Sequence, residues 1–159
     1  MGPTWNERIH GEVVDFLMRE AELLDNKKFE QWLETLTRDV LYHVPIEPRR
    51  DRTEGFDLLS QGAWLSENRK SVEMRVKRLS TPGALAEEPP SRTRHFASNI
   101  RVAAGTAPAE VRALVYRPRG ELVHYDLFSG ERWGKLRRAD GNWKLARRDL
   151  LLDLSLVGA

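Results

Sequence analysis

Apolar residues in the first part of the chain recur with the period of a helix. Five of them fall at spacings of three, four and seven residues, which places them on one helical face: Ile9, Val13, Phe16, Leu17 and Leu24. Thr4 and Glu7 have the spacing of a capping box, so this helix is predicted to begin at Thr4. A shorter stripe of the same period, from Phe29 to Leu36, predicts a second helix packed on the first.

Beyond these helices the pattern becomes less regular. Residues 39–46 alternate and are followed by prolines, which predicts a short edge strand. Residues 47–60 are polar and charged, and a loop of this length in a compact domain tends to be functional or mobile. Residues 66–79 favour a third helix with Val72, Val76 and Leu79 on one face, although the alternation around Met74 leaves a strand open.

The segment from Pro89 to Val102 separates the helical half of the chain from a half rich in strand patterns. Its two prolines cannot continue a helix, and from Arg94 onward the residues alternate. Four residues would share the more apolar face of this strand: Phe96, Ser98, Ile100 and Val102. The segment also concentrates charge, because Arg92, Arg94 and His95 stand at its entrance.

The last third of the chain predicts four more strands, at 110–117, 122–128, 132–138 and 143–154. Asp140-Gly141 lies between two alternating runs and predicts a tight hairpin. Ser129-Gly130 is either a turn or a bulge inside one long bent strand. Successive strands with short connections predict an antiparallel meander covered by two or three N-terminal helices. The expected fold is a single α+β domain over residues 1–159, in which a curved, cone-shaped sheet leaves a pocket against a helix.

The composition excludes several classes of function. There is no cysteine, so the chain has no thiolate nucleophile, no cysteine-bound iron–sulfur cluster and no cysteine zinc site. A net charge of +2 gives little reason to expect nucleic acid as a partner. Neither an apolar run of membrane-spanning length nor a secretory signal pattern is present, and a cytoplasmic location with no membrane partner is expected.

Two kinds of catalytic site stay open on the residues alone. His43, His95 and Asp126 have the ligand types of a 2-His-1-carboxylate iron site, although no two histidines stand at a close motif spacing. Alternatively, pocket residues act as acid and base, with a carboxylate or imidazole as the base and a tyrosine as the donor. The candidates for this chemistry are Asp39, Tyr42, His95, Tyr125 and Asp126.

We favour a structural role in subunit contacts for the basic residues around the start of the strand at Arg94. Planar guanidinium groups bind carboxylates and carbonyls bidentately and are common in interface ion pairs. Arg92, Arg94, His95 and Arg101 are therefore the candidates for a subunit contact, and no catalytic or metal-binding residue is assigned.

Four motifs, in this order along the chain, resemble one known family. They are Phe29-Glu30-Gln31-Trp32-Leu33 followed by Asp39; Glu73-Met74-Arg75-Val76 with Arg78-Leu79; Ser91-Arg92-Thr93-Arg94-His95 with Ser98-Asn99-Ile100-Arg101-Val102; and Gly141-Asn142-Trp143-Lys144-Leu145-Ala146-Arg147-Arg148 leading into Leu151-Leu152-Asp153. They span residues 10–154 and resemble the small (β) subunit of aromatic-ring-hydroxylating dioxygenases, whose cone-shaped fold is shared with nuclear transport factor 2 (NTF2) and is cystatin-like.

The resemblance implies a structural subunit of an aromatic-ring dioxygenase. The large (α) subunit would carry the Rieske [2Fe-2S] cluster and the mononuclear Fe(II), and the two kinds of chain would form an α3β3 hexamer with β–β contacts. The N-terminal arm of many relatives looks short in this chain. Two alternatives stay open: a stand-alone acid–base enzyme of the dehydratase or isomerase type, and an NTF2-like binding module.

Overall fold

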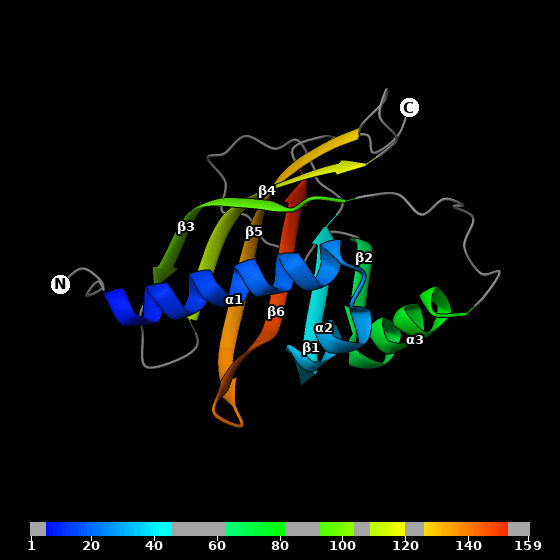
Figure 1. The fold of residues 1–159 in the computed structure, drawn as a ribbon, viewed down its shortest axis with the longest axis horizontal. Coiled ribbons are helices and arrows are strands. Elements are labelled where there is room, and N and C mark those ends of the chain that lie inside the picture. The colour runs from blue at the N-terminus through cyan, green and yellow to red at the C-terminus, as the bar shows by residue number, and fades with distance from the viewer. Residues whose placement is uncertain (1–5, 46–62, 82–92, 104–108, 120–125, 153–159) are drawn as a thin grey trace.

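A six-stranded curved sheet with helices packed against it forms the described part of the chain (Figure 1). The computed structural model describes residues 6–45, 63–81, 93–103, 109–119 and 126–152. Its elements are α1 (Glu7–Asp25), α2 (Phe29–Glu34), β1 (Leu36–Pro45), β2 (Ala63–Asn68), α3 (Arg69–Leu79), β3 (Phe96–Ala103), β4 (Ala109–Arg119), β5 (Asp126–Ala139) and β6 (Asn142–Leu152). The predicted α+β fold is confirmed, with α1 lying across one face of the sheet.

The sheet is mixed rather than purely antiparallel. Its strand order is β2-β1-β6-β5-β4-β3, and β1 runs parallel to β6 while the other neighbours are antiparallel. The prediction that β1 is an edge strand is therefore wrong. Pro45 is tolerated because it is the last residue of β1, where the register with β2 shifts, so the strand interior loses no donor.

The helix starts differ from the predicted ones by a few residues. Asn6 caps α1, accepting a hydrogen bond from the backbone N–H of Ile9 at 3.1 Å, so the predicted start at Thr4 is wrong. The third helix, α3, begins at Arg69 rather than Ser66, with Asn68 and Ser71 forming a reciprocal capping box. The residues before it form strand β2, which the sequence pattern did not reveal, and the predicted loop at 47–60 lies outside the described residues.

A bulge changes which residues of β3 face the core. Between Ser98 and Arg101 the register with β4 shifts by one residue, and Asn99 has a φ of +55°. Asparagine tolerates this left-handed conformation better than most residues. The alternation consequently reverses along the strand: Phe96 is 58% exposed, while Ile100 packs against the core. The predicted apolar face of this strand is therefore wrong in its first half.

The C-terminal strands form the predicted hairpin. Asp140 and Gly141 have φ values of +53° and +79° and join β5 to β6, as the Asp-Gly pattern predicted. The strands predicted at 122–128 and 132–138 give one strand, β5, whose described residues begin at Asp126 and run through Ser129-Gly130 without a turn.

The core lies between the helices and one face of the sheet. Its buried apolar residues come from all three helices and from β1, β5 and β6, and they are Val13, Phe16, Leu17, Trp32, Leu33, Leu36, Val40, Val72, Val76, Leu136 and Leu145. Glu20 on α1 lies on the same helical face as Val13, Phe16 and Leu17, and it is equally buried. This buried carboxylate leads to the charged cluster described next.

Candidate functional site

Charged side chains meet in the interior between α1 and the sheet. The carboxylate of Glu20 accepts a hydrogen bond from Arg148 Nη1 at 2.5 Å, and Arg132 Nη1 lies 3.6 Å from the same oxygen. The side chains of Glu20 and Arg148 are 0% and 2% exposed. The guanidinium of Arg148 also lies over the Tyr42 ring, 5.8 Å from its centroid. We refer to Glu20, Arg132, Arg148 and Tyr42 as the interior cluster.

The interior cluster holds Glu20 and Arg148 in their charged forms. Burial alone would raise the pKa of Glu20, but the charges of Arg148 and Arg132 outweigh it, and the pKa is lowered. Burial likewise opposes the charge on Arg148, yet the Glu20 carboxylate and the Tyr42 side chain together outweigh it, and the pKa of Arg148 is raised. An ionised carboxylate locked between two guanidinium groups is a poor proton acceptor near neutral pH, so this cluster is suited to holding the fold together rather than to acid–base catalysis.

The lowered pKa of Glu20 predicts a loss of stability in acid. Because the pKa is lower in the folded than in the unfolded chain, the stabilisation is present above the ordinary value of 4.5 and is lost as the pH falls through the folded-state pKa. We expect the free energy of unfolding of the wild-type chain, measured by urea titration from pH 7 to pH 3, to fall below about pH 4.5. Glu20→Gln should show a shallower acid limb, and an unchanged slope would contradict the assignment.

A second carboxylate fastens the entrance of β3 to the end of α1. Asp25 Oδ1 lies 2.6 Å from Nδ1 of His95 and accepts a hydrogen bond from the Thr93 hydroxyl at 3.1 Å. Its other oxygen accepts from the backbone N–H of His95 at 3.0 Å. The two side chains of the His95–Asp25 pair are 11% and 8% exposed. We call Asp25, Thr93 and His95 the Asp25 clasp. Further along β3, His10 Nε2 lies 3.3 Å from the carbonyl oxygen of Ile100.

The predicted pocket candidates do not meet in one cavity within the described residues. Asp39 lies on the surface with its side chain 67% exposed and pairs with Arg137, whose hydrogen bond lowers the pKa of Asp39. Tyr42 belongs to the interior cluster, and His95 to the Asp25 clasp. Tyr125 and the side chain of Asp126 lie outside the described residues.

The ligands considered for an iron site are also separated. His43 lies on β1, opposite Asp149 of β6, whereas His95 lies just before β3 at the far edge of the strand order. Among the described side chains, no group of three histidines, cysteines or acidic residues could hold a metal ion. The His43–His95 pairing that the iron site requires is therefore not formed.

The predicted interface residues fall into two environments. Arg94 and Arg101 are exposed, and so is Phe96 on the same segment. His95 points instead into the Asp25 clasp, and Arg92 lies outside the described residues. Arg94, Phe96 and Arg101 together are called the arginine surface below.

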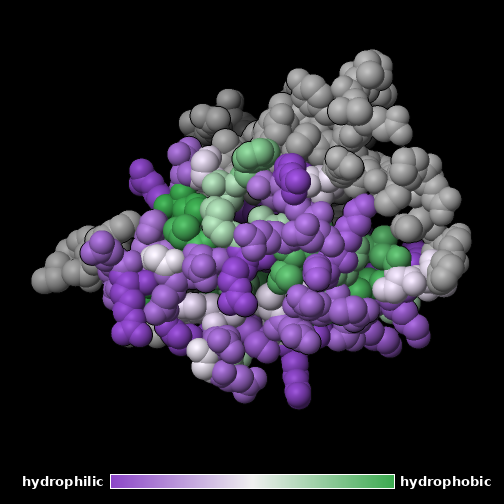
Figure 2. Space-filling model, in the orientation of Figure 1, coloured by the Kyte–Doolittle hydropathy of each residue, from purple (hydrophilic) through white to green (hydrophobic). Residues whose placement is uncertain are grey.

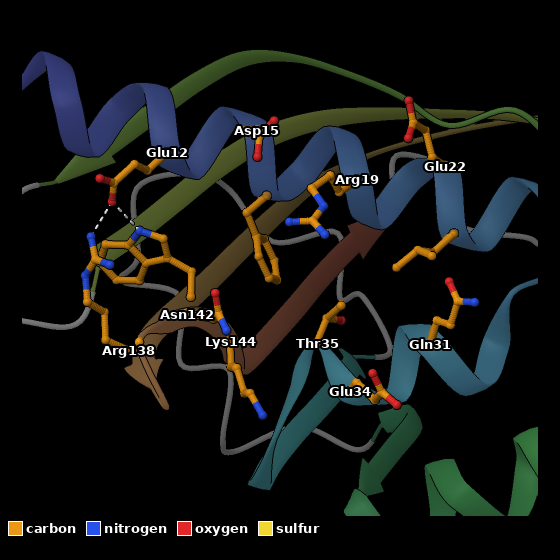
Figure 3. Close-up of a pocket in the computed structure, with 14 residues that line it drawn as sticks. Glu12, Asp15, Arg19, Glu22, Gln31, Glu34, Thr35, Arg138, Asn142 and Lys144 are labelled. Atoms are coloured by element: carbon orange, nitrogen blue, oxygen red, sulfur yellow. Dashed lines mark hydrogen bonds and ion pairs between the residues drawn. The ribbon is translucent and has the colours of Figure 1, made fainter.

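A groove of about 750 Å³ lies on the other side of α1, between this helix, α2 and the β5–β6 turn (Figure 3). One end is fixed by Glu12, which accepts hydrogen bonds from Arg138 and from the Trp143 indole N–H, the latter at 2.8 Å. Arg138 also stacks on the Trp143 ring at 4.5 Å. We call this the α1 groove. The sequence patterns did not predict this groove, because the approach of α2 and the β5–β6 turn to α1 depends on contacts between distant segments.

The fold is that of the NTF2-like, cystatin-like cone, and comparison with solved structures supports this class. A chain of naphthalene 1,2-dioxygenase with indole bound in its active site is 24% identical, with a TM-score of 0.85 over 97% of this chain and 83% of that one. The β subunit of benzoate 1,2-dioxygenase from Burkholderia mallei is 22% identical, with a TM-score of 0.74 over 94% and 92% of the two chains. An NTF2-like protein with a cystatin-like fold from Novosphingobium aromaticivorans is 16% identical, with a TM-score of 0.65 over 90% and 80%.

The family follows from the sequence comparison. Residues 19–159 match the model of the ring hydroxylating beta subunit family, which is most of the chain. The chain therefore belongs to this family of dioxygenase β subunits, as its motifs predicted. Within the described residues, no helix is long and apolar enough to cross a membrane.

Proposed function

We propose that this chain is the structural subunit of a multicomponent dioxygenase that cis-dihydroxylates an aromatic compound in the cytoplasm. The match of residues 19–159 to the ring hydroxylating beta subunit family carries the proposal. Two of the similar solved structures are named as dioxygenases of naphthalene and of benzoate. Both compounds are aromatic, which supports an aromatic substrate for the complex of this chain. All 159 residues would form one domain, and three copies would join three large subunits in an α3β3 hexamer with β–β contacts.

The cofactors of this reaction belong to the large subunit in the proposed complex. A Rieske centre needs two cysteines and two histidines, and this chain contains no cysteine. The mononuclear iron would also be held by the large subunit, since His43 on β1 and His95 just before β3 lie in separated parts of the sheet. The chain contributes a rigid scaffold, because the space between α1 and the sheet is occupied by the interior cluster and the apolar core.

The arginine surface is the part of this chain that we assign to a subunit contact. Arg94, Phe96 and Arg101 are all exposed, and exposed aromatic and arginine residues are enriched at protein interfaces. The Asp25 clasp fixes the backbone between Thr93 and His95, so Arg94 is held in place on an anchored segment. Arg92 is included in this surface on the basis of the sequence alone.

Replacing Arg94 is expected to weaken assembly while leaving the fold intact. The Arg94→Ala chain, co-expressed with its large subunit, should show about tenfold weaker association by light scattering coupled to size exclusion, since arginine is often an interface hot spot. Its circular dichroism and melting temperature should stay at the wild-type values. Arg78→Ala, an exposed arginine on α3, serves as the control. An intact hexamer with altered turnover would overturn the structural assignment of Arg94.

A further inference from the structure

The turn between β5 and β6 contains the only Asp-Gly pair of the sequence, Asp140-Gly141. In Figure 1 this turn lies at one end of the sheet, beyond the level of α1. Figure 2 shows that the described part of the same face is largely hydrophilic. The side chain of Asp140 is 91% exposed, although Lys144 Nζ lies 4.0 Å from its Oδ2 atom. Water therefore has access to the Asp140 carboxyl group.

The main-chain nitrogen next to this carboxyl group is also unobstructed. Gly141 has no side chain, and a Cβ atom placed on it would meet nothing within 4 Å. Among the backbone hydrogen bonds that join described residues outside the helices and strands, none is donated by the Gly141 N–H. A glycine after an aspartate lets the main-chain nitrogen approach the carboxyl carbon closely, whereas a branched side chain in its place would hinder that approach.

We propose that Asp140-Gly141 is a site of spontaneous aspartate isomerisation. The Gly141 nitrogen attacks Cγ of Asp140 within the same turn, so the reaction is intramolecular. The amide hydrogen and the carboxyl hydroxyl leave together as water, and a cyclic succinimide forms. Water then opens this ring at one of its two carbonyl carbons. Opening at Cγ restores aspartate, whereas opening at the main-chain carbonyl carbon leaves Gly141 joined through Cγ, which is isoaspartate.

The reaction needs no other reagent and goes beyond the proposed function. One water molecule leaves and one enters, so the mass of the chain does not change and no oxidant or reductant takes part. The product carries one additional carbon atom in its main chain, in a hairpin whose register depends on the length of its turn.

Isoaspartate at this position is expected to loosen the attachment of α1 to the β5–β6 hairpin. Arg138 and Trp143 are paired across the two strands directly before and after the turn. Both donate hydrogen bonds to the carboxylate of Glu12 on α1. A change in the turn shifts these two residues relative to each other, so one carboxylate can no longer accept from both with the same geometry.

Incubation of the full chain near neutral pH, followed by peptide mapping, tests the site. The peptide that contains Asp140 should give a second form of unchanged mass and shifted retention, whose fragmentation shows the isoaspartyl linkage. Asp39 is the internal control, because its side chain is also exposed, at 67%, but the branched Val40 follows it within β1. Its peptide should give no second form. Absence of the second form at Asp140, or equal amounts at both sites, would overturn the proposal.

The Asp140→Gly variant tests the consequence for α1. It removes the reactive carboxyl group and leaves Gly-Gly, which also suits a tight hairpin turn. The incubated wild type should have a lower melting temperature than the fresh protein, whereas incubated Asp140→Gly should keep its initial value. An unchanged wild-type melting temperature despite isoaspartate at residue 140, or an equal decrease in the variant, would show that isomerisation does not loosen α1.

Discussion

Glu20→Leu is expected to lower the free energy of unfolding by about 3–5 kcal/mol, because it leaves the guanidinium of Arg148 buried without its partner. The side chain of Arg148 is 2% exposed, and its 2.5 Å hydrogen bond to Glu20 compensates its charge. Urea unfolding of the isolated chain, followed by circular dichroism, measures the change.

The double variant Glu20→Leu/Arg148→Met tests whether the lost stability of Glu20→Leu comes from the unpaired charge of Arg148 or from altered packing at residue 20. Replacing both charges by apolar groups of similar size removes the unpaired charge, so most of the lost stability should return. Arg132 also lies 3.6 Å from Glu20 and retains its charge in this variant, so recovery should be incomplete. A double variant as unstable as Glu20→Leu alone would contradict this role of the interior cluster.

Asp25→Ala is expected to lower the free energy of unfolding by about 3 kcal/mol and to weaken assembly as well. The substitution removes the acceptor for the Thr93 hydroxyl and for the backbone N–H of His95, and it removes the partner of the His95 ring. The entrance of β3 then loses its attachment to α1, although the contact between His10 and Ile100 remains further along the strand.

The expected signature of this variant is local opening. Hydrogen exchange should accelerate at the start of β3 and much less in β5 and β6, where the strands are paired on both sides. Glu30→Ala, an exposed carboxylate with no ion pair in the described structure, should change stability by less than about 0.5 kcal/mol. Wild-type stability and exchange in Asp25→Ala would show that the clasp does not hold this strand.

The helices and most strands could be predicted from the sequence because their signals are local. The apolar period of α1 placed Val13, Phe16 and Leu17 in the core, and Asp140-Gly141 marked the hairpin. Local patterns failed where one residue changes the geometry. The left-handed backbone at Asn99 reverses the faces of β3, although the alternation around it reads as an uninterrupted strand.

The candidate site was harder to predict because its pairs join distant segments. Glu20 meets Arg148 from 128 positions away, and His95 meets Asp25 from 70 positions away. Glu20 lies on the apolar face of α1, so its position indicated burial, but nothing in the local sequence indicated its partners. The parallel pairing of β1 with β6 is equally non-local, and the prolines after the alternating run indicated an edge strand instead.

The most direct test of the structural role is to purify the chain alone and together with its large subunit, and to measure mass, iron content and turnover of an aromatic substrate in both samples. The chain alone should fold, contain no stoichiometric iron and show no turnover. Together with the large subunit it should join an α3β3 complex that contains iron and is active. Turnover by the chain alone, or failure to join the large subunit, would contradict the assignment of this protein as a structural β subunit.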